Sequence, residues 1–597
     1  MPISAPDGPD TGFGSGCGAY MKFRTGKHAR GNRPDETGAI RKSWRDRITV
    51  ALVFPNTYPV GITSLGFQSV YRLLNEMDSV VCERAFLPEQ NLKNPDRPLK
   101  TKESGRTLAE FDIVAFSVSF ENDYLHVLTI LDLAGIPLRS KHRRNFHPLV
   151  IAGGVACWLN PEPLAPFLDL VLIGEAEALL PPFIRSCAKG SERSVFLETI
   201  APEIPGVYVP ALYQAVYRPD GSMAAIDHPV DVPATVRRVI VPDLTHSDTC
   251  TTVVSSHTVF GSPFLIEVGR GCSRGCRFCS AGFIYRPPRF RDIASLVDCL
   301  EKGKNVTDRI GLVGAAVSDL PGLESLCRQA TEMGISLAFS SLRADALGKT
   351  LVRALADSGV QTATIAPDAG SERMRRVINK GLSEEDILSG TEALVAAGIP
   401  NLKLYFMVGL PRETDADVDA IVALTARIKK GFLRESRPRG RMGNITVSLN
   451  CFVPKPFTPF QWVAMDDPAR LKKKIMRVRR GLGRIPNIVF RSESPRQAYV
   501  QALLARGDRR VSGALIGAHH HNGDWSRALA ETDFDPDYFV VRRRDVNERL
   551  PWDFIDSGVS KDFLIREYQK ALQERPSLPC PIEHCTRCGA CPPIKNT

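Results

Sequence analysis

Three cysteines stand within eight residues of one glycine-rich stretch, at Cys272, Cys276 and Cys279. Thiolates are soft ligands that suit iron–sulfur clusters and zinc, and Gly271 and Gly275 let the loop wrap around one inorganic centre. A [4Fe–4S] cube has four irons, so three cysteines leave one iron open. An open iron is a place for chemistry, whereas a cluster that only carries electrons is usually closed by four cysteines.

With Phe278 before the third cysteine, the spacing C-x3-C-x-aromatic-C resembles the signature of radical S-adenosylmethionine (SAM) enzymes. The resemblance implies that the open iron takes the amino and carboxylate groups of SAM, and that an electron from the cluster cleaves SAM to a 5′-deoxyadenosyl radical. It also implies an electron donor such as flavodoxin or ferredoxin. A zinc knuckle is the alternative, but zinc wants a fourth ligand nearby and none follows within the next turn.

A second cysteine set has the pattern C-x4-C-x2-C-x2-C, at Cys580, Cys585, Cys588 and Cys591. Four cysteines in twelve residues of a chain that we expect in the cytoplasm indicate a bound metal rather than disulfides. The C-x2-C-x2-C run is typical of ferredoxin loops, whereas structural zinc also takes four thiolates. We favour a second [4Fe–4S] cluster and leave zinc open. A fully ligated cluster would suit electron relay or structural support.

The composition is ordinary for a water-soluble protein, with 43% hydrophobic and 24% charged residues, and 597 residues predict three or more modules. The net charge of +11 permits an anionic partner such as RNA without requiring one. No stretch of about 18 apolar residues occurs, and the first residues lack the features of a signal peptide. We therefore expect a cytoplasmic protein with no membrane partner.

Composition and periodicity divide the chain into five expected segments. They are an irregular arm at 1–46, a Rossmann-like cobalamin-binding-type domain at 47–190, a linker with a small β element at 191–262, a radical SAM core at 263–476, and a C-terminal region with the four-cysteine motif at 477–597.

Between residues 47 and 190, short apolar segments alternate with helical ones, which predicts an α/β fold with a parallel sheet covered on both faces. Ligands of such sheets bind beyond the carboxyl ends of the strands, where Gly61, Gly153 and Gly174 lie. Residues 151–156 and 173–177 resemble the cobalamin-binding-type domain that precedes many radical SAM cores. The glycines are therefore candidate cobalamin contacts, although a tight turn explains Gly153 equally well.

This resemblance departs from its family at one position. Such domains often carry Asp-x-His-x-x-Gly after the first strand, and the histidine reaches cobalt from below. Here the residues are Asn56-x-Tyr58-x-x-Gly61, and a phenol is a poor substitute for a neutral imidazole. Either cobalamin binds without a protein ligand, or the domain is a scaffold.

Six further apolar segments alternate with helices in the expected core, and six βα units match the partial (β/α)6 barrel of the radical SAM fold. Functional residues of a barrel belong at the carboxyl ends of its strands. The segments are 263–268, 309–314, 336–340, 362–366, 402–408 and 445–449.

Candidate cofactor residues lie at these strand ends. Arg343 can hold a carboxylate through its two-pronged donor geometry. Asp368 and Ser371 belong to a Pro-Asp-Ala-Gly-Ser run that is similar to the Pro-Glu-Ala-Gly-Ser-Glu run at the SAM site of cobalamin-type radical SAM enzymes. Ser318 is a candidate for the SAM amino group, and a helix start explains it equally well. Phe278 completes the set, and no catalytic acid, base or nucleophile can be assigned.

From residue 48 onward the chain resembles a bacterial radical SAM family with an N-terminal cobalamin-binding-like domain, on runs at 286–289, 452–462, 506–510 and 551–561. The resemblance brings no substrate with it. We expect methylation or a related group transfer at an unactivated carbon. The alternatives are a tRNA methylthiotransferase-like activity, prompted by the basic helix at 471–480, and a non-catalytic metal-binding regulator.

Overall fold

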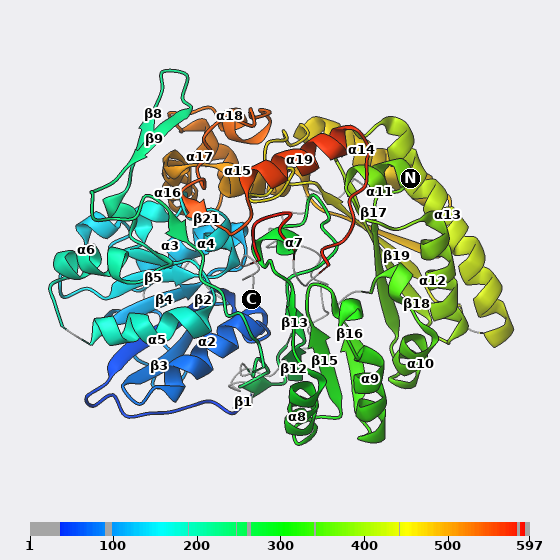
Figure 1. The fold of residues 1–597 in the computed structure, drawn as a ribbon, viewed down its shortest axis with the longest axis horizontal. Helices are drawn as coiled ribbons and strands as arrows, with labels where there is room; N and C mark the ends of the chain where they lie inside the picture. The colour runs from blue at the N-terminus through cyan, green and yellow to red at the C-terminus, as the bar shows by residue number, and fades with distance from the viewer. Residues whose placement is uncertain are drawn as a thin grey trace, which may run out of the picture.

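The computed structural model describes residues 36–89, 98–188, 190–245, 248–258, 264–339, 342–440, 442–581 and 585–591. Two sheets of parallel strands stand beside each other, and helices from the end of the chain lie across the top of both (Figure 1). The α/β fold class, with a Rossmann-like sheet followed by a partial barrel, is confirmed. The expected irregular arm lies outside the described residues as far as residue 35.

The N-terminal sheet has the strand order β3-β2-β4-β5-β6-β7, and all of its strands except β7 are parallel. The sequence analysis missed β3 because Glu83 and Arg84 interrupt its apolar run. Both side chains are buried, and Arg84 forms an ion pair with Glu103 at 2.6 Å. The strands are β2 (Ile48–Thr57), β3 (Val80–Leu87), β4 (Ile113–Ser117), β5 (Leu149–Gly153), β6 (Leu170–Leu172) and β7 (Val207–Tyr208).

Helices α2 (Leu65–Glu76) and α5 (Ala176–Cys187) pack side by side against this sheet, while α3 (Tyr124–Leu133) packs with α16 (Ser512–His520) of the C-terminal region. The segment expected as a linker contains the hairpin of β8 (Gln214–Tyr217) and β9 (Met223–Asp227), together with β7, which completes the sheet. The sheet thus extends beyond the expected boundary at residue 190.

The barrel sheet contains the six expected strands and a seventh, β20 (Ile488–Ser492), which pairs in parallel with β19. The sequence analysis missed β20 because it is a short, partly exposed edge strand beyond residue 476. A bridge between Leu342 and Ile365 joins the two halves of the sheet. The other strands are β12 (Phe264–Glu267), β15 (Arg309–Val313), β16 (Ser336–Phe339), β17 (Thr362–Asp368), β18 (Asn401–Val408) and β19 (Ile445–Cys451).

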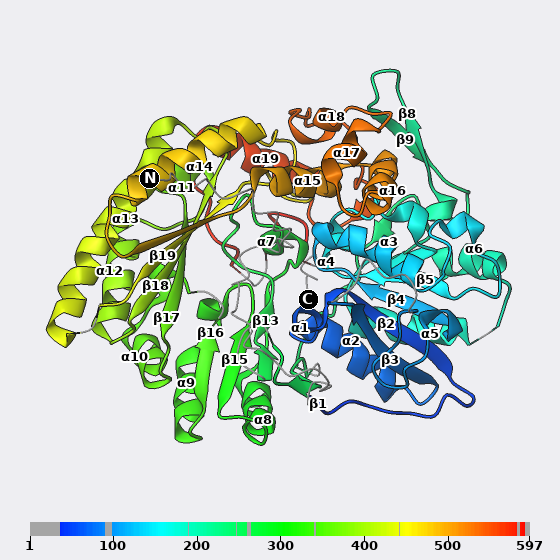
Figure 2. The same ribbon diagram turned by 180° about the vertical axis from the view of Figure 1, so that it is seen from behind.

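Long helices cover the outer side of the barrel strands, as the view from behind shows (Figure 2). None of the helices in the described part of the chain is long and apolar enough to cross a membrane. The outer helices are α8 (Ile293–Lys304), α9 (Leu323–Glu332), α10 (Lys349–Asp357), α12 (Glu384–Ala396), α13 (Asp415–Ser436) and α14 (Pro468–Leu482).

The C-terminal region joins the two sheets. Helices α15 (Pro495–Arg506) and α16 lie over the N-terminal sheet, and α19 (Lys561–Leu572) lies toward the barrel (Figure 1). Arg509 donates to the Glu162 carboxylate at 3.1 Å and to the Tyr208 hydroxyl at 2.7 Å. The Arg-Gly-Asp-Arg-Arg run therefore fastens the C-terminal region to the N-terminal sheet.

Candidate functional site

The loop at residues 271–280, called here the cluster loop, begins after β12 and the short strand β13 (Gly269–Arg270) and ends at helix α7 (Ala281–Ile284). Gly271 has φ +87°, and a Cβ added there would lie 2.7 Å from the Tyr285 carbonyl oxygen. Gly275 has φ +73°. Only glycine adopts these conformations without strain, so both glycines are required for the turn that brings the cysteines together.

The three cysteines of the cluster loop lie half-buried, and Cys272 and Cys279 lie within electrostatic reach of Cys276. The pKa of the Cys276 thiol is raised to about 12, chiefly by burial; Lys380 lowers it, and the charges of Cys279, Asp368 and Cys272 contribute to the rise. Lys380 thus favours the thiolate form, which is the form that binds metal. Within the described residues, no three Cys, His, Asp or Glu side chains already form a metal-binding group.

The candidate Asp368 lies beside the cluster loop at the end of β17, where it adopts φ +62°. Its carboxylate accepts from Lys380 Nζ at 2.5 Å. The sequence analysis missed Lys380; the available signal was a lysine just after the helix that follows the Pro-Asp-Ala-Gly-Ser run. Ser371 is used differently: it caps helix α11 (Glu372–Val377) and donates to Asp417 at 2.6 Å.

Ser318 and Arg343 meet next to the cluster loop, from the ends of β15 and β16. The Arg343 backbone N–H donates to Ser318 Oγ at 3.4 Å, and its guanidinium donates to both Asp345 oxygens at 2.9 Å. The same guanidinium contacts the Lys380 carbonyl at 3.2 Å. The structure therefore brings Arg343 and Asp368 to Lys380, and Ser318 to Arg343. Phe278 is partly buried and packs against the core.

Arg277 anchors the cluster loop, and the sequence analysis missed it. The side chain is fully buried, and it donates to the Val377 carbonyl at 2.9 Å and to Glu567 of α19 at 3.2 Å. It also donates to the Arg575 carbonyl at 2.7 Å. The conformation of the loop thus depends on the end of α11 and on the C-terminal region.

A cavity of about 450 Å³ lies between the N-terminal sheet and the cluster loop. Its far end is an apolar slot between the sheet and helices α2 and α5, and its near end is formed by β13, the start of the cluster loop, Tyr285 and the loop after β15. The apolar lining includes Val50, Leu52, Leu74, Ile113, Phe183 and Ile184.

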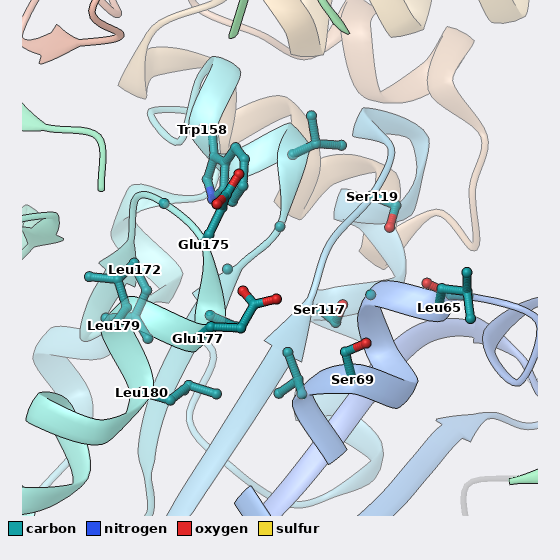
Figure 3. A pocket seen from close by; sticks show the side chains of 18 of the residues that line it. Leu65, Ser69, Ser117, Ser119, Trp158, Leu172, Glu175, Glu177, Leu179 and Leu180 are labelled. Atoms are coloured by element: carbon teal, nitrogen blue, oxygen red, sulfur yellow. The ribbon is translucent and has the colours of Figure 1, made fainter. Parts of the chain in front are cut away.

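Two buried polar groups of this pocket have no hydrogen-bond partner among the described residues, Ser69 Oγ and Trp158 Nε1. Ser69 is 6% exposed and Trp158 is 8% exposed. An unpaired buried polar group costs about 1–3 kcal/mol, so both atoms point to a ligand that is polar in part. Figure 3 shows Ser69 and Ser117 on one side of the pocket and Glu177 on the other.

The near end of the pocket is charged. Arg270 forms ion pairs with Glu177 at 2.5 Å, with Glu267 at 3.0 Å and with Glu175 at 3.2 Å. The Glu175 carboxylate also accepts hydrogen bonds from both terminal nitrogens of Arg289, at 2.7 and 2.9 Å. The Arg-Pro-Pro-Arg run after the cluster loop therefore binds the Gly-Glu turn of the N-terminal sheet and holds the two sides of the pocket together.

Of the three candidate glycines, Gly153 and Gly174 line the pocket and Gly61 does not. A Cβ on Gly153 would have room, 3.7 Å from the Leu172 carbonyl, whereas one on Gly61 would lie 2.5 Å from the Phe86 ring. Gly61 is thus required for packing. Tyr58 is also absent from the pocket lining, and its hydroxyl donates to Glu36 at 2.6 Å.

The tail cysteines, Cys580, Cys585, Cys588 and Cys591, lie next to the cluster loop. The Cys580 backbone N–H donates to the Ser273 carbonyl at 2.7 Å. Burial raises the pKa of the Cys591 thiol, and the charges of Cys580, Cys588 and Cys585 raise it further, so the four sulfurs lie within electrostatic reach of one another. A backbone hydrogen bond thus joins the tail to the cluster loop.

The basic helix is α14, and part of its charge is paired. Lys474 contacts Glu413 and Asp466, both at 2.8 Å, and Arg477 contacts Asp415 at 2.8 Å and Asp419 at 2.5 Å. Other cations of the helix are exposed, at Lys472, Lys473, Arg479 and Arg480.

Two family models match the chain: radical SAM proteins, N-terminal, over residues 66–210, and the radical SAM superfamily over residues 266–425. Among solved structures, TsrM from Kitasatospora setae with tryptophan and a SAM analogue is 15% identical, over 67% of this chain and 72% of that chain, with a TM-score of 0.44. OxsB with aqua-cobalamin and SAM is 14% identical, over 88% and 79%, with a TM-score of 0.45.

Two relatives match by sequence. The tRNA-2-methylthio-N(6)-dimethylallyladenosine synthase of Cereibacter sphaeroides is 27% identical over 205 residues, which are 32% of this chain and 47% of the relative. The uncharacterized protein MJ0966 of Methanocaldococcus jannaschii is 31% identical over 474 residues, which are 78% of this chain and 90% of the relative. With the cluster loop at the head of a parallel barrel, these matches show that the chain belongs to the radical SAM superfamily, in one family with the Methanocaldococcus protein.

Proposed function

We propose that the protein is an enzyme that reductively cleaves SAM at the cluster loop and uses cobalamin, held in the pocket, to methylate or transfer a related group to an unactivated carbon of its substrate. One observation carries the proposal: the pocket extends from two buried polar groups of the N-terminal domain, which have no partner among the described residues, to Gly271 at the start of the cluster loop.

The residues of the cluster loop fit a [4Fe–4S] cluster. The three cysteines supply thiolates to three irons, Gly271 and Gly275 allow the turn between them, and Lys380 offsets their negative charge. When bound, the cluster supplies the electron that cleaves SAM. Arg343 offers a guanidinium to the carboxylate of SAM, and Ser318 and Asp368 offer oxygen acceptors to its amino group.

The pocket residues fit a cofactor that is apolar in one part and polar in another. The apolar slot excludes water, Trp158 Nε1 and Ser69 Oγ offer hydrogen bonds, and Gly153 and Gly174 belong to the pocket wall. Cobalamin, when bound, supplies a methyl carrier. Arg289 and Glu175 hold the pocket against the cluster loop, so that a group carried in the pocket stays close to the SAM residues.

Anaerobic reconstitution tests the proposal. The protein is loaded with iron and sulfide, titrated with cobalamin, and incubated with SAM and dithionite. We expect stoichiometric cobalamin binding and formation of 5′-deoxyadenosine. A protein that makes no 5′-deoxyadenosine is not the proposed enzyme, and this outcome would favour the non-catalytic regulator. A protein that cleaves SAM but binds no cobalamin uses its N-terminal sheet as a scaffold.

Ser69→Ala tests the pocket both without and with a bound ligand. Without a ligand, removal of the unpaired hydroxyl should leave thermal stability unchanged or slightly higher. With cobalamin, the loss of one hydrogen bond should weaken binding about two- to tenfold. Both effects are measured by thermal unfolding of the cobalamin-free protein and by cobalamin titration.

Ser448→Ala is the matched control, because Ser448 Oγ is also buried and unpaired but lies on β19, outside the pocket lining. It should not change cobalamin affinity. Equal affinity in Ser69→Ala and the unmodified protein would mean that Ser69 does not contact the cofactor.

Tyr58→Phe tests the lower face of cobalt. Burial, together with the hydrogen bond to Glu36, raises the pKa of the Tyr58 hydroxyl, so the phenol stays protonated and is a poor metal ligand. We expect cobalamin affinity and the visible spectrum of the bound cofactor to be unchanged in the variant. A shifted spectrum would show that Tyr58 is a cobalt ligand.

Modification of RNA by methylthiolation is the second candidate, favoured by the partial match to the tRNA methylthio synthase and by the exposed cations of α14. It ranks lower because Lys474 and Arg477 are held in ion pairs with acidic residues, three of them on or next to α13. Salt-dependent retention of transfer RNA by the unmodified protein, lost after reversal of charge at Lys472 and Lys473, would favour it.

A further inference from the structure

We propose that the tail cysteines hold a second [4Fe–4S] cluster, which relays electrons from a protein donor to the cluster at the cluster loop. This inference rests on the proposed cleavage of SAM, because reductive cleavage needs one electron for each SAM. It gives the C-terminal region a redox function in addition to its structural contacts.

The two cysteine sets are close enough for such a relay. The Cys580 N–H donates to the carbonyl oxygen of Ser273 at 2.7 Å, and Ser273 is the neighbour of Cys272 in the chain. With standard backbone dimensions, this contact limits the distance between the Cα atoms of Cys272 and Cys580 to about 10 Å. A hydrogen bond thus links the backbones of the two sites directly.

The tail site is built into the body of the protein. The Ser560 N–H, at the start of α19, donates to the Cys588 carbonyl at 2.8 Å, and Cys588 is only 2% exposed. Gly589 has φ +87° and lies against Ser560, so the turn inside the cysteine set needs a glycine. Helix α19 also carries Glu567, which contacts Arg277 of the cluster loop at 3.2 Å. One helix therefore supports both cysteine sets.

Four thiolates suit both iron and zinc, and the position of the tail beside a centre that needs electrons favours iron. Four thiolates complete the coordination of four irons, leave none for SAM, and match a site that only carries electrons. Zinc has no redox chemistry. A zinc ion in the tail could therefore not supply electrons to the neighbouring cluster. The exposed side chains of Thr586 and Arg587 place the loop of the tail site at the surface, where a donor protein can reach it.

The relay balances as a one-electron transfer. A low-potential donor of the flavodoxin or ferredoxin class loses one electron, which reduces the tail cluster. The tail cluster then passes this electron to the cluster at the cluster loop and returns to its oxidised state. No bond forms or breaks in the tail site, and the electron is consumed where SAM is cleaved.

The experiment compares the full-length, anaerobically reconstituted protein with a variant that carries Cys585→Ala, Cys588→Ala and Cys591→Ala. A control carries Cys187→Ala, Cys327→Ala and Cys451→Ala, three cysteines outside both sets. We expect iron to fall from about eight to about four per chain in the tail variant alone. The electron paramagnetic resonance signal that SAM perturbs should remain.

Activity is measured with two reductants. With dithionite, which reaches the cluster loop directly, the tail variant should form 5′-deoxyadenosine at the rate of the control. With flavodoxin or ferredoxin and its reductase, the rate should fall at least tenfold. Cys591→Ser is the substitute if the triple variant does not fold, because Cys591 is half-buried whereas Cys585 and Cys588 are buried. This single variant should also lower the flavodoxin-driven rate.

Each other outcome overturns the inference in a distinct way. Zinc in place of iron shows a structural tail site. Equal rates with flavodoxin in the tail variant and the control exclude a relay. Loss of both rates together with the SAM-perturbed signal shows that the tail only supports the cluster loop. If the unmodified protein cleaves no SAM even with dithionite, the proposed function fails, and the iron count still identifies the metal of the tail.

Discussion

Replacement of Cys272, Cys276 or Cys279 by alanine should abolish SAM cleavage, one residue at a time. Each thiolate bonds a different iron, so no remaining cysteine can take over its position. Iron should fall by about four per chain, and 5′-deoxyadenosine should disappear with dithionite and with a protein donor alike. The loss of dithionite-driven activity separates these variants from those of the tail cysteines.

Cys187→Ala is the matched control, because Cys187 is also half-buried but lies at the end of α5, away from both cysteine sets. Its iron content and its rate should equal those of the unmodified protein. Undiminished cleavage in any one of the three cluster-loop variants would contradict the assignment of that cysteine as a cluster ligand.

The cluster loop was predictable because its signal is local. The cysteine spacing and the two glycines determine a turn within ten residues, and the backbone has the left-handed conformation at both glycines that such a turn needs. Gly153 and Gly174 were predicted as cofactor contacts from a similarly local signal, a strand followed by glycine; both line the pocket, and the cofactor contact stays a prediction.

Contacts between distant parts of the chain were not predictable in this way. Arg277 and Glu567 are 290 residues apart, and Ser273 and Cys580 are also far apart in the chain. No periodicity or spacing reports such a pair. The pocket has the same limitation: its glycines are visible in the sequence, but Ser69 becomes notable only once α2 and α5 are known to pack side by side.

Two errors in the strand predictions have a common cause. Strand β3 carries the buried charges of Glu83 and Arg84, of which Arg84 pairs with Glu103 outside the strand, and β20 is a partly exposed edge strand, so neither has the continuous apolar run of a central parallel strand. Ser371 shows a different limit. A likeness to a SAM-binding run suggested a cofactor contact, whereas the hydroxyl caps α11 and donates to Asp417.

Arg277→Met should cause a large loss of stability at the junction of the cluster loop and the C-terminal region. The guanidinium is fully buried, and its removal leaves the Glu567 carboxylate without this ion pair and takes the donor from the Val377 and Arg575 carbonyls. Breaking a buried ion pair by removal of one partner typically costs about 3–5 kcal/mol. Glu567 keeps its contacts to Lys570 and Ser577, which reduces the cost.

We expect the first unfolding transition of the variant to occur at a lower temperature, cleavage by protease after Arg575 to become faster, and iron to be lost from both cysteine sets. Arg376→Met is the control, because this neighbouring arginine has an exposed side chain and contributes only its backbone carbonyl to Arg277. It should match the unmodified protein in all three measurements. An Arg277→Met protein with unchanged protease resistance and unchanged iron content would show that the C-terminal region stays docked without this contact. The hydrogen bond between Cys580 and Ser273 would then suffice to hold the tail beside the cluster loop.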